Sequence, residues 1–433
     1  MELVEGRSLK PLKQPLDPQV CQKAARYAVR VFEEMSKRSE LLKGSSSSST
    51  PTTSTGHVAV IDREDVLPYL GELLGKGGFN CVYELRSNLL RDVLSGNEVI
   101  VPKFQGRTDS PPTSPSPEDD PAQDTPHNNE DNDYDDDASI KINHKKLAVK
   151  FLSDEAMFDP QEFCNGAADL YMEAKYLTAL AAHPHPALIR LHGVCSAGPD
   201  GFSKVERAGF FLVIDRLYDT LDRRMDVWKE IAHRRHGQTD ALQALFLQRL
   251  LVAQDIASAI RHLHKLNIVF RDLKPDNVGF DYDGQVKLFD FGLAKELDPK
   301  QRLNDGLYKM SGGTGSRRFM APEVALAEPY NLSADLYSYA ILLWEVLTLR
   351  KAFTSMTLED HREQVVLNGE RPELTDSTTM IWSDGLTHLM ETCWHPDPFE
   401  RPTARDVCRI LRTEIQNIYY ESFGDEKNDE KQS

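Results

Sequence analysis

Four side chains in one part of the chain have the chemistry that transfer of a phosphate group requires. Asp272 and Lys274 lie in the run Phe-Arg-Asp-Leu-Lys-Pro-Asp-Asn, which ends at Asn277, and an Asp-Phe-Gly triplet begins thirteen positions later at Asp290. A carboxylate can accept the proton of an incoming hydroxyl, and an ammonium group can neutralise a transferred phosphoryl group. The side chains of Asn277 and Asp290 offer the hard oxygen atoms that Mg²⁺ prefers. The order and spacing of these two segments therefore predict phosphoryl-transfer chemistry.

Two upstream segments are suited to holding a nucleotide. Gly75, Gly77 and Gly78 form a cluster between two strand-like runs, where a backbone without side chains allows phosphates to approach closely. The cluster is not a P-loop, because no Gly-Lys-Ser/Thr sequence ends it. Further along, Lys150 ends the run Leu-Ala-Val-Lys, whose apolar residues indicate a strand.

In the order of the chain, the four segments are the glycine cluster, the run ending in Lys150, the run ending in Asn277 and the Asp-Phe-Gly triplet. Together they resemble the corresponding segments of the eukaryotic protein kinases. The run from Cys393 to Pro398 resembles the tyrosine-kinase-like branch of serine/threonine kinases, and the resemblance extends from about Val66 to Ile418. It implies an α+β, bilobal protein kinase fold. The small lobe would be an antiparallel β lobe with one regulatory helix, and the large lobe would be mostly helical. ATP and Mg²⁺ would bind in the cleft between them.

The resemblance also implies a role for each matching residue. Asp272 and Lys274 would act at the reacting hydroxyl, while Asn277 and Asp290 would bind Mg²⁺. Lys150 would hold the α- and β-phosphates and pair with Glu173 on the regulatory helix. Glu162 is a competing partner for this lysine. The residues expected around ATP are Leu74, Gly75, Gly77, Gly78, Val82, Ala148, Lys150, Ile214, Asp215 and Leu217.

The chain departs from the family pattern at two positions. Phe270 replaces a histidine that serves mainly in packing, so we expect its ring to fill that place in a stack with Leu177 and Phe291. Asn80 stands where the third glycine of the hairpin is usual, and asparagine tolerates unusual backbone angles better than most residues. Neither departure removes the groups required for catalysis.

The segment from Asp290 to Glu323 resembles an activation segment, since it ends in Met-Ala-Pro-Glu. Arg271 is a ready bidentate partner for a phosphate, which implies control by phosphorylation, with a possible upstream kinase as partner. Ser316 matches the residue that contacts the catalytic aspartate and the substrate. The other candidate switch hydroxyls are Tyr308, Ser311 and Thr314, of which we favour Ser311 and Thr314; hydroxyls without a regulatory role are the alternative.

Two features are expected to organise the large lobe. Asp335 begins an apolar helix whose residues Tyr339 to Leu347 should anchor this lobe. Glu323 is expected to pair with Arg401 in a buried ion pair, and a pair of that kind is costly to break.

Composition divides the chain into three parts. The net charge of the 433 residues is −17, but eleven acids without a single Lys or Arg lie between Asp109 and Asp137, and without them it is about −6. We expect a disordered acidic insertion at about 102–140, inside a kinase domain at 62–420. An extension at 1–61, with a possible helix and a flexible Ser/Thr linker at Ser45 to Thr55, precedes it, and a flexible tail at 421–433 follows. In the extension, apolar residues from Val20 to Met35, including Tyr27, follow helical spacing, which suits either a partner or packing on its own domain.

The six cysteines lack metal-ligand spacing, so we expect reduced thiols in the cytoplasm, with the nucleus as an open alternative. We expect no nucleic-acid partner and no membrane span.

Lys274 with Pro275 resembles kinases that act on serine and threonine, which implies a protein substrate with a Ser/Thr acceptor. Two rivals are a catalytically dead pseudokinase that acts as a scaffold, and a small-molecule or lipid kinase. The full catalytic set argues against the first, and the Ala-Pro-Glu segment argues against the second.

Overall fold

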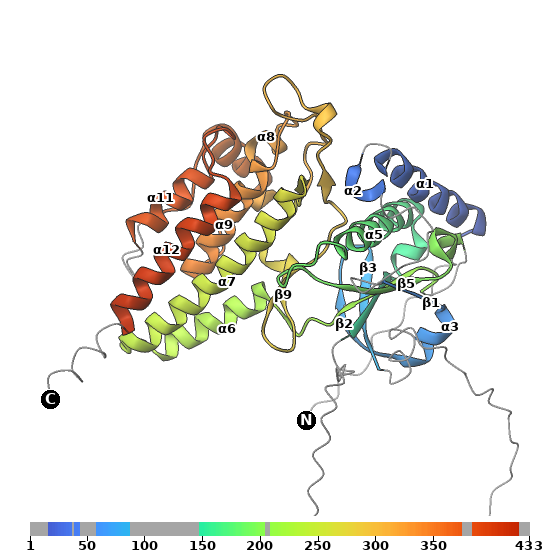
Figure 1. Ribbon diagram of the computed structural model, residues 1–433, viewed down its shortest axis with the longest axis horizontal. Helices are drawn as coiled ribbons and strands as arrows, with labels where there is room; N and C mark the ends of the chain where they lie inside the picture. Colours follow the sequence, from blue (N-terminus) through green and yellow to red (C-terminus); the bar gives the residue numbers. More distant parts are fainter. Residues whose placement is uncertain are drawn as a thin grey trace, which may run out of the picture.

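The computed structural model describes residues 16–36, 39–43, 58–86, 147–203, 208–374 and 383–423. These residues form two lobes, a smaller one built on a β-sheet and a larger one built mainly on helices (Figure 1). The α+β, bilobal fold expected from the sequence is therefore confirmed. The predicted acidic insertion at 102–140, the Ser/Thr linker before residue 58 and the end of the tail beyond residue 423 lie outside the described residues.

The small lobe contains a six-stranded sheet. All neighbouring strands are antiparallel except β1 and β5, which are parallel. β4 is buried along its whole length, because it has a strand on either side and apolar residues on both faces. Its run Leu-Ala-Val-Lys-Phe-Leu places Lys150 inside the lobe. The sheet order is β1 (Ala59–Ile61), β5 (Leu191–Cys195), β6 (Phe211–Asp215), β4 (Leu147–Leu152), β3 (Asn80–Leu85) and β2 (Leu70–Lys76).

One long helix, α5 (Pro160–Leu180), packs on this sheet. It begins after Asp159, whose carboxylate accepts hydrogen bonds from the backbone N–H groups of the first turn, and proline occupies its first position. The N-terminal helices α1 (Pro18–Ser36) and α2 (Glu40–Lys43) pack against α5 (Figure 1). Of the two interpretations of the N-terminal helix, packing on its own domain is the one observed. Tyr27 is 46% exposed and does not belong to the buried face, in contrast to the apolar stripe expected from the spacing.

The large lobe is organised around α9 (Ser333–Thr348), which is buried on every side from Ala334 to Leu347. The hydroxyl of Tyr339 donates a hydrogen bond of 2.9 Å to the carbonyl of Ala253 on a neighbouring helix. This burial confirms the expected apolar anchor helix. α7 (Thr239–Lys265) and α11 (Asp384–Cys393) pack on α9, and α6 (Leu221–Arg234) and α12 (Ala404–Phe423) pack on α7.

Short elements frame the predicted catalytic run between the lobes. One small sheet has the order β10 (Val286–Leu288), β9 (Val278–Phe280), β7 (Asp219–Thr220), and another pairs β11 (Lys295–Glu296) with β8 (Ile268–Val269). The remaining helical turns are α3 (Arg63–Val66), η2 (Leu67–Tyr69), η4 (Ala156–Phe158), η5 (Gly198–Ser203), η6 (Pro275–Asn277), η7 (Pro299–Gln301), η8 (Arg317–Phe319), α8 (Pro322–Ala325), α10 (Leu358–Asp360) and the π-helical η9 (His361–Leu367).

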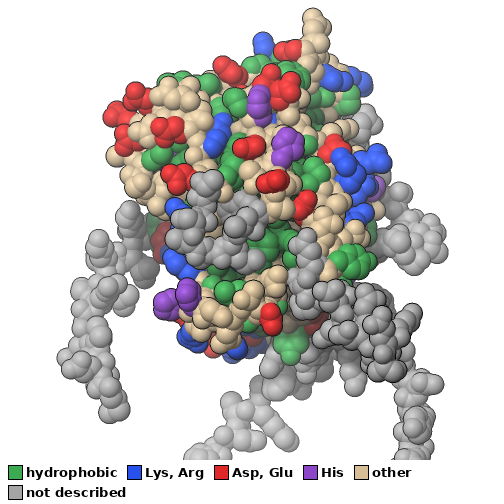
Figure 2. All heavy atoms as spheres, turned by 90° about the vertical axis from the view of Figure 1, so that its left-hand side faces the viewer, with side chains coloured by type: hydrophobic (Ala, Val, Ile, Leu, Met, Phe, Trp, Pro, Cys, Tyr) green, Lys and Arg blue, Asp and Glu red, His purple; other side chains and the backbone are tan. Residues whose placement is uncertain are grey.

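The surface of the large lobe carries charges of both signs. Figure 2 shows acidic and basic side chains interspersed over this face, together with apolar side chains. Within the described ranges, no helix is both long enough and apolar enough to cross a membrane.

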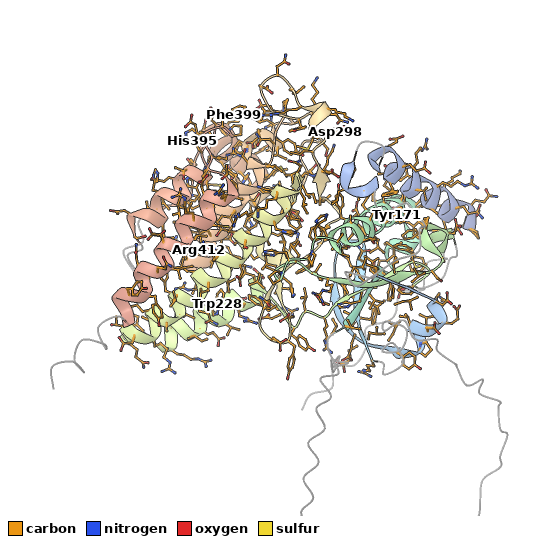
Figure 3. The ribbon with its side chains drawn as sticks, viewed as in Figure 1. Tyr171, Trp228, Asp298, His395, Phe399 and Arg412 are labelled. Carbon is orange, nitrogen blue, oxygen red and sulfur yellow. The ribbon has the colours of Figure 1, made fainter. Side chains whose placement is uncertain are left out.

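A buried ion pair joins two distant segments of the large lobe, as expected. Arg401 forms a bidentate pair with Glu323, with nitrogen–oxygen distances of 2.7 and 2.8 Å. The Nε of Arg401 also donates to the carbonyl of His395, a residue of the large lobe that is labelled in Figure 3. Because both charged groups are buried, each depends on the other for the hydrogen bonds it gave up in water.

The substitution Arg401→Ala is expected to lower the free energy of unfolding by about 3–5 kcal/mol, because it leaves the Glu323 carboxylate buried without its partner. Arg409→Ala is the matched control, since Arg409 forms an exposed pair with Asp406 and its loss should cost less than about 1 kcal/mol. Chemical denaturation of both variants measures the difference. Equal, small losses would contradict a structural role for the buried pair.

Candidate active site

A buried lysine joins the two lobes. The Nζ of Lys150 on β4 lies 2.6 Å from Glu173 Oε2 on α5 and 3.2 Å from Asp290 Oδ1. Burial alone would lower the pKa of Lys150, but Asp290 and Glu173 outweigh it and raise the pKa above the ordinary lysine value. Lys150 in turn holds the pKa of Asp290 below its usual range. Glu162, the competing partner, is exposed in the first turn of α5.

The residues predicted around the reacting hydroxyl lie together. Lys274 Nζ is 2.8 Å from both Asp272 Oδ2 and Ser316 Oγ. The backbone N–H of Ser316 donates to Asp272 Oδ1 at 2.8 Å, and the side-chain amide of Asn277 donates to Asp272 Oδ2 at 2.9 Å. Asp272 is thus a buried carboxylate fixed by donors from three sides. These bonds set its orientation before any substrate arrives.

The backbone of this loop is held by a residue whose role the sequence did not reveal. Asp335, at the start of α9 and fully buried, accepts the N–H groups of Phe270 and Arg271 at 2.8 and 2.9 Å and contacts His264 Nε2 at 2.9 Å. Arg271 has a φ of +70°, a conformation that costs a non-glycine residue free energy. The available signal was an acid in the first turn of an otherwise apolar helix.

The Asp-Phe-Gly triplet is anchored to the catalytic run by its aromatic ring. Phe291 meets Phe270 edge-on, with ring centroids 5.3 Å apart, and both rings are fully buried together with Leu177 on α5. The expected replacement of histidine by a packing ring is therefore confirmed. The backbone N–H of Phe289 donates to the carbonyl of Asn277 at 3.0 Å, which ties the triplet to the second predicted metal ligand. Asp290 itself has a φ of +70°.

The predicted nucleotide-binding residues lie on the hairpin of β2 and β3 and on the strands and connecting segment beyond it. A Cβ placed on Gly75 or Gly78 would meet no atom within 4 Å, so the hairpin of β2 and β3 leaves room beside its backbone. Leu74 and Val82 are half-buried on the hairpin. Asn80 lies in β3 without a positive φ, so its departure from glycine requires no unusual backbone angle.

On the neighbouring strands, Ala148 of β4 pairs with Ile214 of β6, and both are buried. Leu217 lies against Gly279 of β9, where the small and large lobes meet. The carboxylate of Asp215 is turned to His192 and the N–H of Arg190, at 2.7 and 2.9 Å. The side chain of Asp215 is therefore already hydrogen-bonded to these two residues.

The activation segment approaches the catalytic loop through Arg271. Its Nη1 donates to Ser311 Oγ at 2.9 Å and to Tyr330 Oη at 3.3 Å. Ser311 is exposed, and its hydroxyl lies 3.0 Å from that of Thr314. Of the predicted switch hydroxyls, Ser311 is thus held directly at the arginine. Tyr308 instead forms a backbone bridge with Tyr330.

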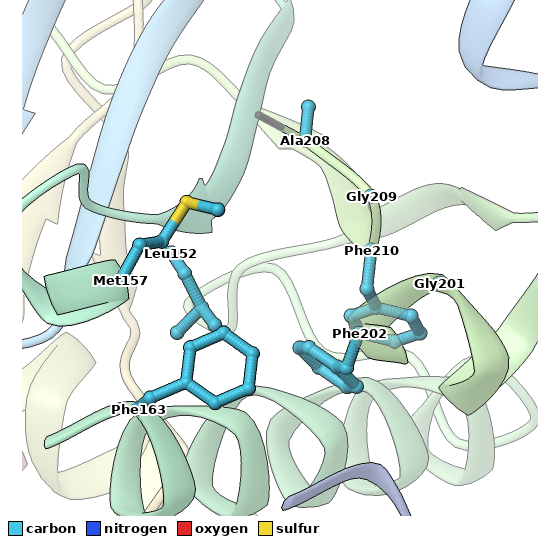
Figure 4. Close-up of a pocket in the computed structure, with 8 residues that line it drawn as sticks. All are labelled: Leu152, Met157, Phe163, Gly201, Phe202, Ala208, Gly209 and Phe210. Atoms are coloured by element: carbon cyan, nitrogen blue, oxygen red, sulfur yellow. The ribbon is translucent and has the colours of Figure 1, made fainter. Parts of the chain in front are cut away.

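The structure also contains a pocket away from these residues. Leu152, Met157 and Phe163 face Phe202 and Phe210 across a small apolar pocket between α5, β4 and η5 (Figure 4). Its lining carries no titratable side chain. It marks the packing of α5 against the sheet and supplies no chemistry to the site around Asp272.

Asp169 is an acidic residue near the site that sequence reasoning missed. It lies one helical turn before Glu173 on α5, and its Cβ is close to Gly292 of the Asp-Phe-Gly triplet. Burial, together with the charge of Asp290, raises the pKa of Asp169 to about 6. Between pH about 4 and about 6 the native residue keeps a proton that the unfolded chain has lost, so the free energy of unfolding falls as pH rises through this window.

Asp169→Asn removes this cost and is expected to raise the free energy of unfolding by about 1–3 kcal/mol at pH 7 in the absence of nucleotide and metal. At pH 4 the gain should vanish, because the carboxyl group is then protonated in the native state. Denaturation curves at both pH values test this, with the exposed Asp154→Asn as control. A gain of the same size at both pH values would contradict the explanation.

Comparisons with known proteins agree with this geometry. The protein kinase domain model matches residues 138–410, which is more than half of the chain. The chain is 32% identical over 234 residues to serine/threonine-protein kinase STY17 of Arabidopsis thaliana, which covers 54% of this chain and 36% of the relative. It is 30% identical over 249 residues to serine/threonine-protein kinase STY46 of the same plant, which covers 58% of this chain and 37% of the relative.

A third relative is dual specificity protein kinase shkC of Dictyostelium discoideum, 36% identical over 166 residues, which covers 38% of this chain and 31% of the relative. The chain thus spans about a third of the length of these relatives. Their names agree with the expected resemblance to the tyrosine-kinase-like branch of serine/threonine kinases. Together with the domain match, they establish that the chain belongs to the protein kinase domain family.

Proposed function

We propose that the protein is a serine/threonine protein kinase that transfers the γ-phosphoryl group of ATP to a hydroxyl of a protein substrate. The observation that carries this proposal is the arrangement around Asp272, whose carboxylate lies within hydrogen-bond distance of Lys274, Asn277 and Ser316. The formed pair between Lys150 and Glu173 supports it from the nucleotide side.

Asp272 has the position and partners of a group that receives a hydroxyl. Its Oδ2 accepts from Lys274 and Asn277, whereas its Oδ1 accepts from the Ser316 backbone and has a second lone pair for a substrate hydroxyl. Lys274 lies beside the same oxygen atoms, where its charge would stabilise negative charge that develops on the phosphoryl group. The protein contributes position and electrostatics, which is what phosphoryl transfer demands.

The residues present also suit ATP with Mg²⁺. Asn277 uses its amide nitrogen on Asp272, which leaves its amide oxygen as a ligand, and Lys150 keeps Asp290 ionised. Among the described residues no group of three or more His, Cys, Asp or Glu side chains forms a metal site of protein ligands alone. Mg²⁺ ordinarily takes one or two protein ligands and completes its shell with phosphates and water. Bound in this way, it would neutralise the phosphate charge as the phosphoryl group leaves.

The two rival functions fit these contacts less well. A pseudokinase scaffold has no chemical need for the closed ion pair of Lys150 and Glu173 or for the hydrogen bonds around Asp272. A kinase of small molecules or lipids has no need for an activation segment that carries Ser316 beside Asp272 and is tied by Glu323 to Arg401. A protein with a Ser/Thr acceptor is therefore the proposed partner.

Control by an upstream kinase is part of the proposal. Ser311 is exposed and its hydroxyl already touches Arg271, so a phosphate there would form a bidentate pair with the guanidinium group. Such a pair would fix the activation segment to the catalytic loop. The cytoplasm remains the proposed compartment, with the nucleus open, because all six cysteines carry free thiols.

Transfer of radiolabel from ATP with Mg²⁺ to a generic serine/threonine peptide tests the activity. Asp272→Asn and Lys150→Met should each lower the rate by about 10²–10⁴-fold, because one removes the group at the hydroxyl and the other a phosphate contact. The matched controls are Asp226→Asn and Lys229→Met, both on the exposed face of α6. Label on Ser or Thr that persists in both site variants would contradict the proposed chemistry.

Phosphatase treatment tests the regulation. Removal of phosphate from the activation segment should lower the activity of the natural chain about tenfold or more, and Ser311→Ala should leave the treated and untreated forms alike. Full activity with Tyr308, Ser311, Thr314 and Ser316 all unmodified, as verified by mass spectrometry, would refute the regulatory role of Arg271.

A further inference from the structure

The N-terminal helices α1 and α2, together with Ser39, lie against α5 and β11, two elements next to the candidate active site. α1 runs along the outer side of α5, and α2 lies beside the start of the activation segment (Figure 1). The face of α1 turned to α5 is buried and mostly made of small side chains, so the two helices approach closely. Its buried residues are Cys21, Ala24, Ala25, Ala28 and Phe32.

The first attachment of this segment is aromatic. Phe32 meets Tyr171 of α5 edge-on, with ring centroids 5.6 Å apart, and Lys175 Nζ lies 4.6 Å from the Phe32 centroid. Tyr171 stands on the α1 side of α5 (Figure 3). Since Tyr171 precedes Glu173 by two residues, the contact acts on the helix that presents Glu173 to Lys150.

The second attachment is polar and bridges residues far apart in the sequence. Ser39 is only 4% exposed, and its hydroxyl donates to Oε2 of Glu296 on β11. The N–H of Leu41 donates to the other carboxylate oxygen at 3.3 Å, and the N–H of Leu42 donates to the Ser39 hydroxyl at 2.7 Å. Both oxygen atoms of the Glu296 carboxylate therefore accept hydrogen bonds, one from Ser39 and one from Leu41 in α2.

Glu296 also connects to the catalytic machinery. Its own N–H donates to the hydroxyl of Tyr176 at 3.0 Å, and Tyr176 lies three residues after Glu173 on α5. In the ladder of β11 with β8, Glu296 pairs with Ile268, just before the catalytic run. One residue thus links α2, α5 and the strand that leads to Asp272.

We propose that Ser39 and Glu296 are positioning residues for phosphoryl transfer, and that α1, Ser39 and α2 form an intramolecular clamp that holds α5 inward. The clamp acts through Glu173: with Tyr171 and Tyr176 both held, α5 cannot swing away from β4 unless these contacts break. This inference rests on the proposed kinase function but not on which substrate is phosphorylated.

A negative charge at position 39 is expected to break the attachment to Glu296. Ser39→Asp replaces the donor to Glu296 by a second carboxylate in a buried place, where two like charges repel strongly. Adding Glu296→Lys converts the repulsion into an ion pair, which restores the link to position 39 although the bond from the Leu41 N–H is lost. If Ser39 and Glu296 do not act through each other, the double variant should be worse than each single variant, whereas the clamp predicts rescue.

The experiment uses the full chain and measures kcat and the KM for ATP with a generic serine/threonine peptide. Ser39→Asp should lower kcat/KM about tenfold or more, mainly through the KM for ATP, because Lys150 loses its orienting partner. The double variant Ser39→Asp/Glu296→Lys should return to within about threefold of the natural chain. Thr239→Asp, which adds the same charge at the exposed start of α7, is the control.

Amide hydrogen exchange of α5 supplies a readout that does not need activity. Exchange should become faster in Ser39→Asp and slow again in the double variant, even if the natural chain transfers no phosphoryl group. In that case the proposed function fails while the clamp stands. Should Ser39→Asp not fold, Ser39→Ala gives the same comparison without the added charge. Unchanged exchange and kinetics in the single variants, or a double variant without rescue, would overturn the clamp.

Discussion

The buried carboxylate of Asp335 is the constraint on which the rest of the site depends. A buried carboxylate is very costly unless its oxygen atoms are hydrogen-bonded, and Asp335 meets this need with the backbone of Phe270 and Arg271. The same bonds offset the unfavourable left-handed conformation of Arg271. Since Asp272 is the next residue, these bonds fix the backbone from which its side chain projects, while Lys274, Asn277 and the Ser316 backbone orient the carboxylate itself.

A second set of contacts connects the catalytic loop in the large lobe to the sheet and α5 of the small lobe. Phe270 packs on Phe291, and Asp290, its neighbour, bonds Lys150 on β4. Lys150 then bonds Glu173, so the catalytic loop, the activation segment and α5 form one connected unit. The attachments of the N-terminal segment act on the outer side of the same helix. Any displacement of α5 therefore reaches the residues that would hold the phosphates.

Sequence reasoning succeeded where the chemistry is local. Asp272, Lys274, Asn277 and Ser316 meet as expected, because short motifs fix both residue type and backbone conformation. Sequence reasoning failed where the burial of a residue depends on the shape of another element that packs against it. Helical spacing placed Tyr27 in the apolar stripe of α1, yet only the shape of α5 decides which face is buried.

The same limit explains the polar contacts that were missed. Ser39 and Glu296 are separated by 257 positions, and the four-residue helix α2 is too short to give a periodic pattern. Asp335 was expected only as the start of an apolar helix, since nothing local shows that its carboxylate turns to the catalytic loop. We conclude that this carboxylate, through its bonds to the backbone of Phe270 and Arg271, holds the loop from which Asp272 projects. The direct measurement is kcat and ATP affinity of Asp335→Asn, with Asp226→Asn as control. Asparagine keeps the shape but offers one acceptor oxygen in place of two, so kcat should fall about 100-fold while the dissociation constant of ATP changes less than about threefold. A kcat within about twofold of the natural chain, with the fold intact, would contradict the account.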